Sequence, residues 1–417
     1  MNKIARLTKD GFRNQNTIDK PRKSKRNNPD YILMAMIILT TLFGVLMVYS
    51  ASRYYCANKG WAPTKFAFKQ LSLAAVGFIA MYFIIFKFDY HSFFKFKWKG
   101  IDGIWLIYWV CIILAASVKF IGIEANGAKR WLQVGPVQIQ PSEFLKIAVA
   151  LAITHFIVDH KESFDRSLVT KGMAWVVIGI PAGVVTVLGS NLSSGIVILG
   201  IGALIIMAAS KNIKTYLVLV VAGVAAIFWV RHLAVITPQG QDPNVPVVNK
   251  ILVGYRLDRV RAWIDPFTDP KNKGYQPIQS LYSVSGGGLF GKGIFNGVQK
   301  LGFLPEPYND IIFAVICEEL GLVGAIALMV VYMAMVIRGL MIAIKAKDYE
   351  GAYVAIGISG MIGLQAVINA AVNTNTIPTT GMQLPLVSYG GTALVVLLAT
   401  LGILLNISTK ANIEKFE

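Results

Sequence analysis

The stretch YILMAMIILTTLFGVLMVYSA, residues 31–51, decides the fold, because it contains 21 consecutive residues without a charge. An α-helix needs about 20 mostly apolar residues to cross the hydrocarbon core of a bilayer. Further apolar runs of comparable length lie at 70–86, 103–121, 144–158, 172–189, 192–209, 215–233, 310–337, 351–373 and 385–407. The sequence therefore predicts an all-α polytopic integral membrane protein, with a bundle of about ten transmembrane helices.

The composition supports this class. Of the 417 residues, 55% are hydrophobic and 15% are charged, whereas charged residues make up about 25% of an average soluble domain. The net charge is +18, but nine of the first 30 residues are Lys or Arg. A basic tail beside a first span is retained in the cytoplasm. We therefore expect residues 1–30 to be a disordered cytoplasmic tail near the membrane, with no nucleic-acid partner.

The charges between the spans predict the topology. With the N-terminus inside, ten crossings also leave the C-terminal end, residues 410–417, in the cytoplasm. The Lys-rich segments 87–100, 211–214 and 338–347 then lie inside, as positive-inside topology requires. One external loop fits this rule poorly, since it contains Arg53, Lys59, Lys65 and Lys69.

Two long external segments stand out within the predicted membrane domain, residues 31–409. One is 122–143, and the other is 234–309, between the seventh and eighth spans. Loops longer than about 12–15 residues are usually functional or disordered. The second segment is rich in Trp, Tyr, Phe and Gly, so we expect it to fold back toward the membrane with short helices.

Acidic residues gather where the eighth span begins. Glu306 and Asp310 are four residues apart and would share a face if the helix starts that early. Two carboxylates there suit a general base, a divalent-cation site, or both. Acids also favour helix N-termini, and Asp310 could simply cap the span. Further along, Glu318 and Glu319 lie at membrane depth, where we expect them to pair with polar groups inside the bundle.

A basic and aromatic surface is predicted on the same external face. Its members are Lys129, Arg130 and Trp131 in one segment, and Arg256, Arg259 and Arg261 in the other. Arg and Lys match phosphate groups, and Trp favours the bilayer interface. These residues indicate an anionic lipid-like substrate such as a polyprenyl diphosphate. A belt of side chains reaching toward lipid headgroups would show the same pattern.

Two glycine-containing stretches interrupt the regular pattern. SVSGGGLFGKG at 283–293 could expose backbone amides to a phosphate or sugar, or could be a loop without a ligand. TTGMQLPLVSYGG at 379–391 breaks the helix at the start of the last span, which is tolerated where backbone lines a cavity. The pattern predicts a cavity there, but it is equally typical of transporters.

Together with these features, several motifs resemble the SEDS family, which includes RodA, FtsW and SpoVE. The resemblance covers residues 31–409. The matching motifs are MVYSAS at 47–52, NGAKRWLQVGPVQIQPSEFLK at 126–146, YRLDRVRAWIDPFTDPKNKGYQPIQSLYSVSGGGLFGKG at 255–293, QKLGFLPEPYNDIIFAVICEELG at 299–321 and PTTGMQLPLVSYGG at 378–391.

The resemblance implies a peptidoglycan glycosyltransferase with a ten-helix fold. Such an enzyme polymerises lipid II into glycan strands by inverting transfer and releases polyprenyl diphosphate, with no nucleotide. It implies that Asp310 is the essential acid. It also implies functional roles for the Arg130–Trp131 pair and for the motif Gln140, Pro141, Ser142, Glu143 and Lys146.

From residues and resemblance together, we expect catalysis by Asp310. Asp310 and Glu306 would hold a divalent cation (Mg or Mn), if one is used. The expected substrate-binding residues are Lys129, Arg130, Trp131, Arg256, Arg259, Arg261, Glu143, Lys146, Glu306, Lys300, Gln279 and Ser388.

The resemblance implies partners and a location as well. They are lipid II, a polyprenyl-linked glycan, a class B penicillin-binding protein transpeptidase and other divisome proteins, in the bacterial cytoplasmic membrane with an external active site. The QKLGFLPE and PTTGMQLPLVSYGG motifs look closer to the division and sporulation branch than to the elongation branch. A lipid II flippase and a non-catalytic scaffold for the transpeptidase remain alternatives.

The chain departs from the family pattern at two places. Many members have His-Thr before the key acid, where this chain has Tyr308 and Asn309. Many have Pro-Asp-Leu-Gly at the sixth span, where this chain has Ser190, Asn191, Leu192 and Ser193. Both departures leave the other motifs intact, so we expect activity to be retained.

Overall fold

A computed structural model describes residues 28–125, 128–135, 137–210 and 255–411 of the chain. In this part, eight helices are long and apolar enough to cross a membrane. They are α2 (Tyr31–Asn58), α3 (Lys65–Phe86), α5 (Gly103–Ile121), α6 (Pro141–Asp159), α8 (Leu168–Val187), α9 (Leu192–Ala209), α14 (Ile312–Lys345) and α15 (Tyr349–Asn373). A shorter apolar helix, α16 (Thr392–Ser408), follows them. The protein is an all-α polytopic membrane protein, as the sequence predicts.

Nine of the ten predicted spans correspond to these helices. The predicted span at 215–233 lies outside the described residues. Two helices begin later than predicted. Helix α14 begins at Ile312 rather than at 310, and α16 begins at Thr392 rather than at 385. Residues 385–391 instead form an irregular segment, as expected from its proline and paired glycines.

Short polar side chains fix where several helices begin. Asp30 accepts a hydrogen bond from the Leu33 amide at 2.9 Å, and Asn191 accepts one from Ser194 at 3.1 Å. Asp348 caps α15 in the same way through Gly351. Such caps satisfy amides that have no partner within the helix. Pro141 at the start of α6 needs no partner, because it has no N–H.

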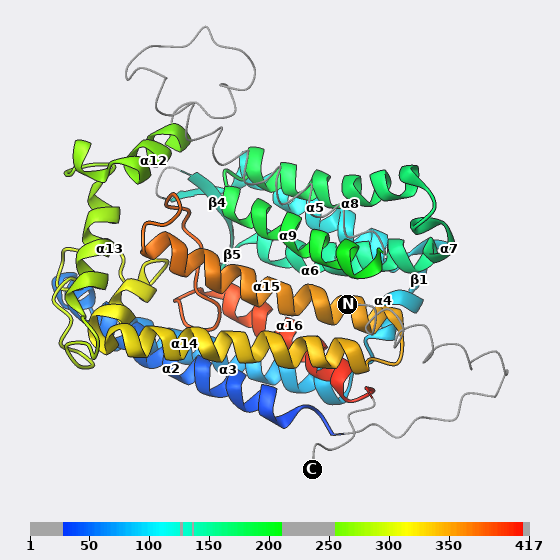
Figure 1. Ribbon diagram of the computed structural model, residues 1–417, viewed down its shortest axis with the longest axis horizontal. Coiled ribbons are helices and arrows are strands. Elements are labelled where there is room, and N and C mark those ends of the chain that lie inside the picture. The colour runs from blue at the N-terminus through cyan, green and yellow to red at the C-terminus, as the bar shows by residue number, and fades with distance from the viewer. Residues whose placement is uncertain (1–27, 126–127, 136, 211–254, 412–417) are drawn as a thin grey trace, which may run out of the picture.

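The long helices lie side by side, so the bundle has two distinct ends (Figure 1). One end, called here the site end, contains the small sheet β3 (Ile123–Ala125), β4 (Ala128–Val134) and β5 (Val137–Ile139), and the helices α12 (Tyr255–Ile264), η1 (Pro266–Thr268) and α13 (Tyr275–Gly286). The opposite end contains α4 (His91–Lys95), β1 (Lys97–Trp98), β2 (Ile101–Asp102) and α7 (Lys161–Phe164). The helices α12 and α13 match the expectation for 234–309, whereas the antiparallel sheet in 122–143 was not predicted.

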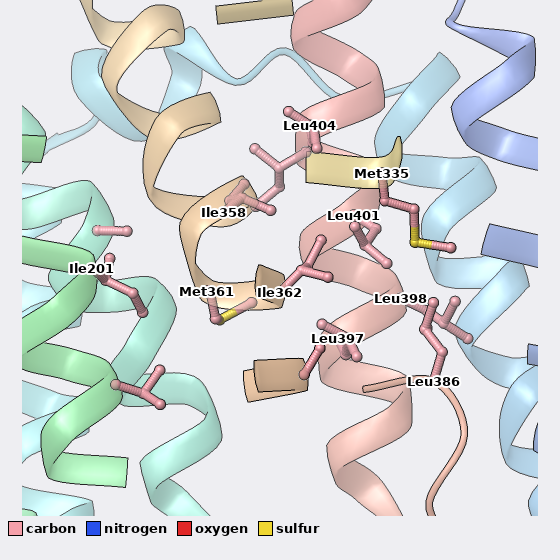
Figure 2. Packing of buried hydrophobic residues seen from close by; sticks show 14 of the residues in the cluster. Ile201, Met335, Ile358, Met361, Ile362, Leu386, Leu397, Leu398, Leu401 and Leu404 are labelled. Atoms are coloured by element: carbon pink, nitrogen blue, oxygen red, sulfur yellow. The ribbon is translucent and has the colours of Figure 1, made fainter. Parts of the chain in front are cut away.

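Helix α15 joins the two halves of the bundle. It packs against α14 and α16 on one side and against α6 and α9 on the other. Figure 2 shows the resulting core, in which Ile358 and Ile362 of α15 face Leu397, Leu401 and Leu404 of α16. All five are nearly or fully buried. Because lipid is as apolar as this core, close packing stabilises the contact more than burial from water does.

The glycine-rich stretch 283–293 packs against a break in α14. Gly321 has φ 71° and ψ −171°, a conformation open only to glycine. Its neighbours Leu322 and Val323 donate backbone hydrogen bonds to Gly288 and Leu289, at 2.9 and 3.1 Å. The glycines therefore permit backbone-to-backbone contact within the protein, and the stretch has a structural explanation.

Two buried acids fasten the same loop, as predicted for Glu318 and Glu319. The Glu318 carboxylate accepts from Lys292 Nζ at 2.7 Å and from the Val298 amide at 2.9 Å. Glu319 accepts from Ser50 Oγ and pairs with Lys300. Both acids are fully buried, and a buried charge requires such partners.

Candidate active site

The backbone at Asp310 is fixed by two amide side chains of α15. Asn369 Nδ2 and Asn373 Nδ2 donate to the Asp310 carbonyl oxygen at 2.8 and 3.0 Å. Asn373 Oδ1 also accepts from the Ala314 amide in the first turn of α14. The residue that caps α14 is Ile311, without a side-chain hydrogen bond. The Asp310 carboxylate is thus not used as the helix cap, and it remains available for chemistry.

Glu306 and Asp310 do not share a helical face, because α14 begins only at Ile312 and the condition for a shared face is not met. Both residues precede α14 and lie in turns, and Glu306 has φ 44°. The physical reason is Pro307, which disfavours a helical conformation in the residue before it. Glu306 Oε2 accepts from Asn309 Nδ2 at 2.7 Å.

The neighbours of Asp310 act on the pKa of its carboxyl in opposite directions. Burial is the largest effect and raises the pKa of the Asp310 carboxyl above its ordinary value, and the nearby Glu306 charge raises it further. Arg259 and Arg130 lower this pKa, but their effect is smaller. A carboxyl with a raised pKa is a better proton acceptor at neutral pH than an ordinary aspartate.

Arg130, Asp310 and Gly381 meet at one point. A Cβ added to Gly381 would lie 3.2 Å from Arg130 Nη1 and 3.4 Å from Asp310 Oδ2. Gly381 has φ 64°, so glycine both permits this backbone conformation and leaves room beside the two charges. Arg130 is itself oriented by a 2.9 Å hydrogen bond from Nη2 to the Ser190 carbonyl.

Helix α12 covers the site from the side of the 374–381 segment. Arg259 Nη1 donates to the Thr379 carbonyl at 2.9 Å, and Trp263 Nε1 donates to the Asn375 carbonyl at 3.0 Å. These bonds place a second arginine beside Asp310 from an element far away in sequence. Arg261 lies half-buried in the last turn of the same helix.

An open cavity adjoins this point. It has an empty volume of about 650 Å³, solvent at its mouth included. Cationic, acidic and amide side chains line one part, namely Arg130, Glu143, Lys146, Asn191 and Gln365. The irregular segment 381–390 forms the other part, as the helix break predicts. Lys146 is 1% exposed and pairs with Glu143 Oε2 at 2.7 Å.

Backbone conformations that are rare for residues other than glycine also gather here. Ser190, Glu306 and Leu386 all have φ between 44° and 65°. Such residues are found disproportionately at active sites and ligand sites. Ser190 binds Arg130, and Leu386 lines the cavity.

A family model of cell cycle proteins, FtsW/RodA/SpoVE, matches residues 30–413. The chain belongs to the FtsW/RodA/SpoVE family. Stage V sporulation protein E of Bacillus subtilis is 33% identical over 92% of this chain and 98% of that protein. The probable peptidoglycan glycosyltransferase FtsW of the same organism is 34% identical over 91% of this chain and 90% of its own.

Solved structures show the same fold. A chain from a peptidoglycan synthase complex that coordinates polymerization and crosslinking aligns with a TM-score of 0.67 at 24% identity, covering 93% of this chain and 99% of that one. Thermus thermophilus RodA aligns with a TM-score of 0.61 at 22% identity, covering 93% and 98%.

The structure of this FtsW/RodA/SpoVE family member brings many of the predicted site residues together. Arg130, Trp131, Glu143, Lys146 and Ser388 all line the cavity. Asp310 adjoins it at Gly381, and Arg259 donates to the carbonyl of Thr379, two residues before Gly381. Lys129 is exposed on β4, where its backbone pairs with Glu124. The Arg256 side chain lies outside the described part of the structure.

Two predicted binding residues of the family member lie elsewhere. Lys300 is 4% exposed and donates to Ser50 Oγ at 2.7 Å while it pairs with Glu319. Its ammonium group therefore has a structural role, which corrects the prediction that it binds substrate. Gln279 is half-buried on α13 and does not line the cavity.

Sequence reasoning missed the amide residues of α15. Gln365, Asn369 and Asn373 are four residues apart within an otherwise apolar span, so they share one helical face. Gln365 lines the cavity, and the two asparagines fix Asp310. Polar residues at this spacing in a membrane span were the signal that could have identified them.

Among the described residues, two groups of three could provide metal ligands, and both lie at the opposite end. They are His91, Asp348 and Glu350, and Asp102, His155 and Asp159. Asp310 and Glu306 supply two carboxylates at the site end. That number suits Mg²⁺, which often uses one or two carboxylates together with substrate phosphates.

Proposed function

We propose that this protein is a peptidoglycan glycosyltransferase that polymerises lipid II in cell division or sporulation. The observation that carries the proposal is the position of Asp310. Its backbone is fixed by Asn369 and Asn373, and its carboxyl has a raised pKa beside two arginines and a polar cavity. The family relatives named peptidoglycan glycosyltransferase and stage V sporulation protein E support this assignment.

The proposed reaction is one direct displacement. The Asp310 carboxylate accepts the proton of the acceptor GlcNAc 4-hydroxyl, and that oxygen forms a bond to C1 of the donor sugar. The bond between C1 and the polyprenyl diphosphate breaks, and the diphosphate leaves with the electron pair. An α-linked donor thereby gives a β-linked product. No nucleotide is required, since the donor is already activated.

Cationic side chains would stabilise the leaving group. Arg130 and Arg259 lie beside Asp310, and Lys146 lines the cavity. Fixed cations directed at a developing negative charge lower the barrier without reorganising in the reaction. A divalent cation (Mg or Mn), held by Asp310 and Glu306 together with substrate phosphates, would add to this effect.

We further propose that the site end faces the outside of the cytoplasmic membrane, with both chain ends in the cytoplasm. The basic tail and the Lys-rich loops of the opposite end support this orientation. A class B penicillin-binding protein transpeptidase is the proposed partner. The similarity to a chain of a complex that couples polymerization to crosslinking supports that pairing.

The test is lipid II polymerisation by the purified full-length protein, with and without the transpeptidase and Mg²⁺ or Mn²⁺. We expect glycan strands from the wild type, and a loss of about a hundredfold or more for Asp310→Asn, because the amide accepts no proton. Lys119→Gln, a change at the same end in the last turn of α5, is the matched control.

Three outcomes would overturn the proposal. Equal activity of Asp310→Asn and wild type would remove Asp310 from the role of base. Movement of lipid II across vesicle membranes without any polymer would identify a flippase instead. Transpeptidase recruitment without either activity would identify a scaffold.

A further inference from the structure

A second cationic surface lies beside the 388–390 segment, which contributes Ser388 and Gly390 to the cavity wall. It consists of Lys65 and Lys69 in the first two turns of α3, and it is called here the α3 lysine pair. Their spacing of four residues places both on one face of the helix. Both side chains are exposed. Both belong to the group of four basic residues, Arg53 to Lys69, whose predicted external position fits the positive-inside rule poorly.

The position of these lysines is unfavourable for the isolated protein. The N-terminal turn of a helix has a partial positive charge and favours acidic residues. The first turn of α3 contains no acid, and its N-cap, Thr64, makes no side-chain hydrogen bond. In the part of the chain that the structure describes, neither lysine pairs with a carboxylate. An anionic ligand would offset this accumulation of charge.

Aromatic rings link the α3 lysine pair to the catalytic residue. Lys65 Nζ lies 3.2 Å from the centroid of the Trp61 ring, and Lys69 Nζ lies 6.0 Å from that of Tyr389. The Tyr389 ring is 5.9 Å from Tyr308, two residues before Asp310. The Tyr389 amide also donates to the Tyr308 carbonyl at 2.9 Å. The pair is thus separated from Asp310 by a short layer of aromatic side chains.

A buried amide next to the lysines has an unused acceptor. Gln70 is fully buried, and its Nε2 donates to the Ser388 carbonyl at 3.0 Å. Its Oε1 has no hydrogen-bond partner in the described structure. Unsatisfied buried polar atoms are uncommon and require an explanation. A hydroxyl-bearing ligand or a bound water at this end of α3 would satisfy it.

We propose that the α3 lysine pair binds the diphosphate of a second polyprenyl-linked substrate. This inference rests on the proposed function, since a polymerase must bind two lipid diphosphates at once. The site then contains two cationic subsites. Arg130 and Arg259 act directly on Asp310, and the α3 lysine pair lies beyond the Tyr389 ring.

The chemistry of the two substrates decides which subsite takes which lipid. The donor reacts at the carbon that carries its diphosphate, so its diphosphate must lie next to Asp310, near Arg130 and Arg259. The acceptor reacts at a hydroxyl that is a whole disaccharide away from its own diphosphate. The α3 lysine pair lies at a distance from Asp310, beyond Tyr389 and Tyr308. We therefore assign it to the acceptor, lipid II.

The first test measures binding, without any turnover. Full-length protein in phosphatidylcholine nanodiscs is titrated with farnesyl diphosphate by equilibrium dialysis. We expect two equivalents for the wild type and one for Lys65→Gln/Lys69→Gln. The matched control, Lys119→Gln/Lys271→Gln, removes the same charge from the site end and should still bind two. Two equivalents with the α3 variant, or one with the control, would overturn the assignment.

Two competitors distinguish the sources of the anion. Inorganic diphosphate should displace farnesyl diphosphate only weakly, because it lacks the prenyl chain. Equal displacement would assign the subsite to a free diphosphate. Nanodiscs with phosphatidylglycerol should still bind the second equivalent. Loss of the second bound equivalent in phosphatidylglycerol nanodiscs would identify the lysines as contacts for ordinary anionic lipid.

The second test follows extension of a preformed polyprenyl-linked glycan by lipid II. For Lys65→Gln/Lys69→Gln, we expect the KM for lipid II to rise by about tenfold or more, with kcat within about twofold. A fall in kcat at unchanged KM would contradict an acceptor subsite. Binding of two equivalents without polymerisation would remove the proposed function and leave the subsite. Polymerisation by the wild type, together with binding of two equivalents of farnesyl diphosphate by the α3 variant, would keep the proposed function and remove the subsite.

Discussion

At the scale of single residues, the site depends on how charges around Asp310 are balanced. Burial and Glu306 raise the pKa of its carboxyl, while Arg259 and Arg130 lower it. A general base works only when deprotonated, so a raised pKa moves the acidic limit of activity to higher pH. Each neighbour should therefore shift that limit in a direction that its charge sets.

The pH dependence of kcat/KM should separate these neighbours. In Arg130→Gln, a cation that lowers the pKa of Asp310 is lost, so activity should begin to fall at a higher pH than in the wild type. In Glu306→Gln, an anion that raises this pKa is lost, so the fall should begin at a lower pH. Lys119→Gln should leave the profile unchanged. Shifts of the same sign in both site variants would contradict this electrostatic account.

At the scale of structural elements, α14 depends on a glycine conformation within a membrane helix. Gly321 has φ 71°, and a Cβ there would lie 2.3 Å from the Gly291 amide nitrogen. The break lets the loop after α13 bond to the backbone of α14, and Glu318 and Glu319 fasten it. The same loop leads directly to Glu306 and Asp310, so its attachment supports the site.

Gly321→Ala should therefore destabilise the fold and weaken activity. The strained conformation alone costs about 1–3 kcal/mol for a residue other than glycine, and the steric overlap adds to that cost. We expect a lower Tm in detergent than for the wild type. Gly183→Ala, in a helical position with open space around the added methyl group, is the control and should keep the wild-type Tm. An unchanged Tm for Gly321→Ala would show that the loop attachment contributes little.

Sequence patterns reveal some elements of this protein better than others. Apolar runs predicted the transmembrane helices, because burial in lipid imposes length and composition on a span. They did not reveal the sheet β3–β5, whose short strands carry no comparable signal. Pro385 and the Gly390–Gly391 pair predicted the irregular cavity wall correctly. The sequence left open whether the helix would include Glu306, and the structure excludes it because Pro307 outweighs the favourable spacing of the two acids.

Contacts between distant residues were the least accessible to sequence. Lys300 is a cationic residue within a family motif, as a substrate ligand would be. Only the fold shows that its ammonium group is bound by Glu319 and Ser50. The junction of Arg130, Asp310 and Gly381 joins residues from three separate segments. No local pattern encodes such a junction; the family resemblance indicated roles for Arg130 and Asp310, and only the fold shows that they meet.

At the scale of the whole molecule, the two ends of the bundle are built for different tasks. At the opposite end, Asp30 pairs with Arg338 at 2.7 Å and its amide donates to Ser408 Oγ at 3.0 Å. These contacts connect the start of α2 to the C-terminal parts of α14 and α16. The site end instead contains the cavity and the strained backbone of Ser190, Glu306 and Leu386. Stabilising contacts at one end leave the other free to bind ligands.

The direction of the bundle in the membrane provides the last prediction. If the site end is external, a cysteine at Lys271, exposed between η1 and α13, should react with an impermeant maleimide in intact spheroplasts. A cysteine at Lys347, exposed between α14 and α15, should react only after the membrane is permeabilised. Both changes would be made in a background lacking the native Cys56, Cys111 and Cys317. The reasoning is that Lys-rich loops remain inside, and that lipid-linked glycan is polymerised outside. Labelling in the reverse order would place Asp310 in the cytoplasm, where an extracellular polymerase could not use it.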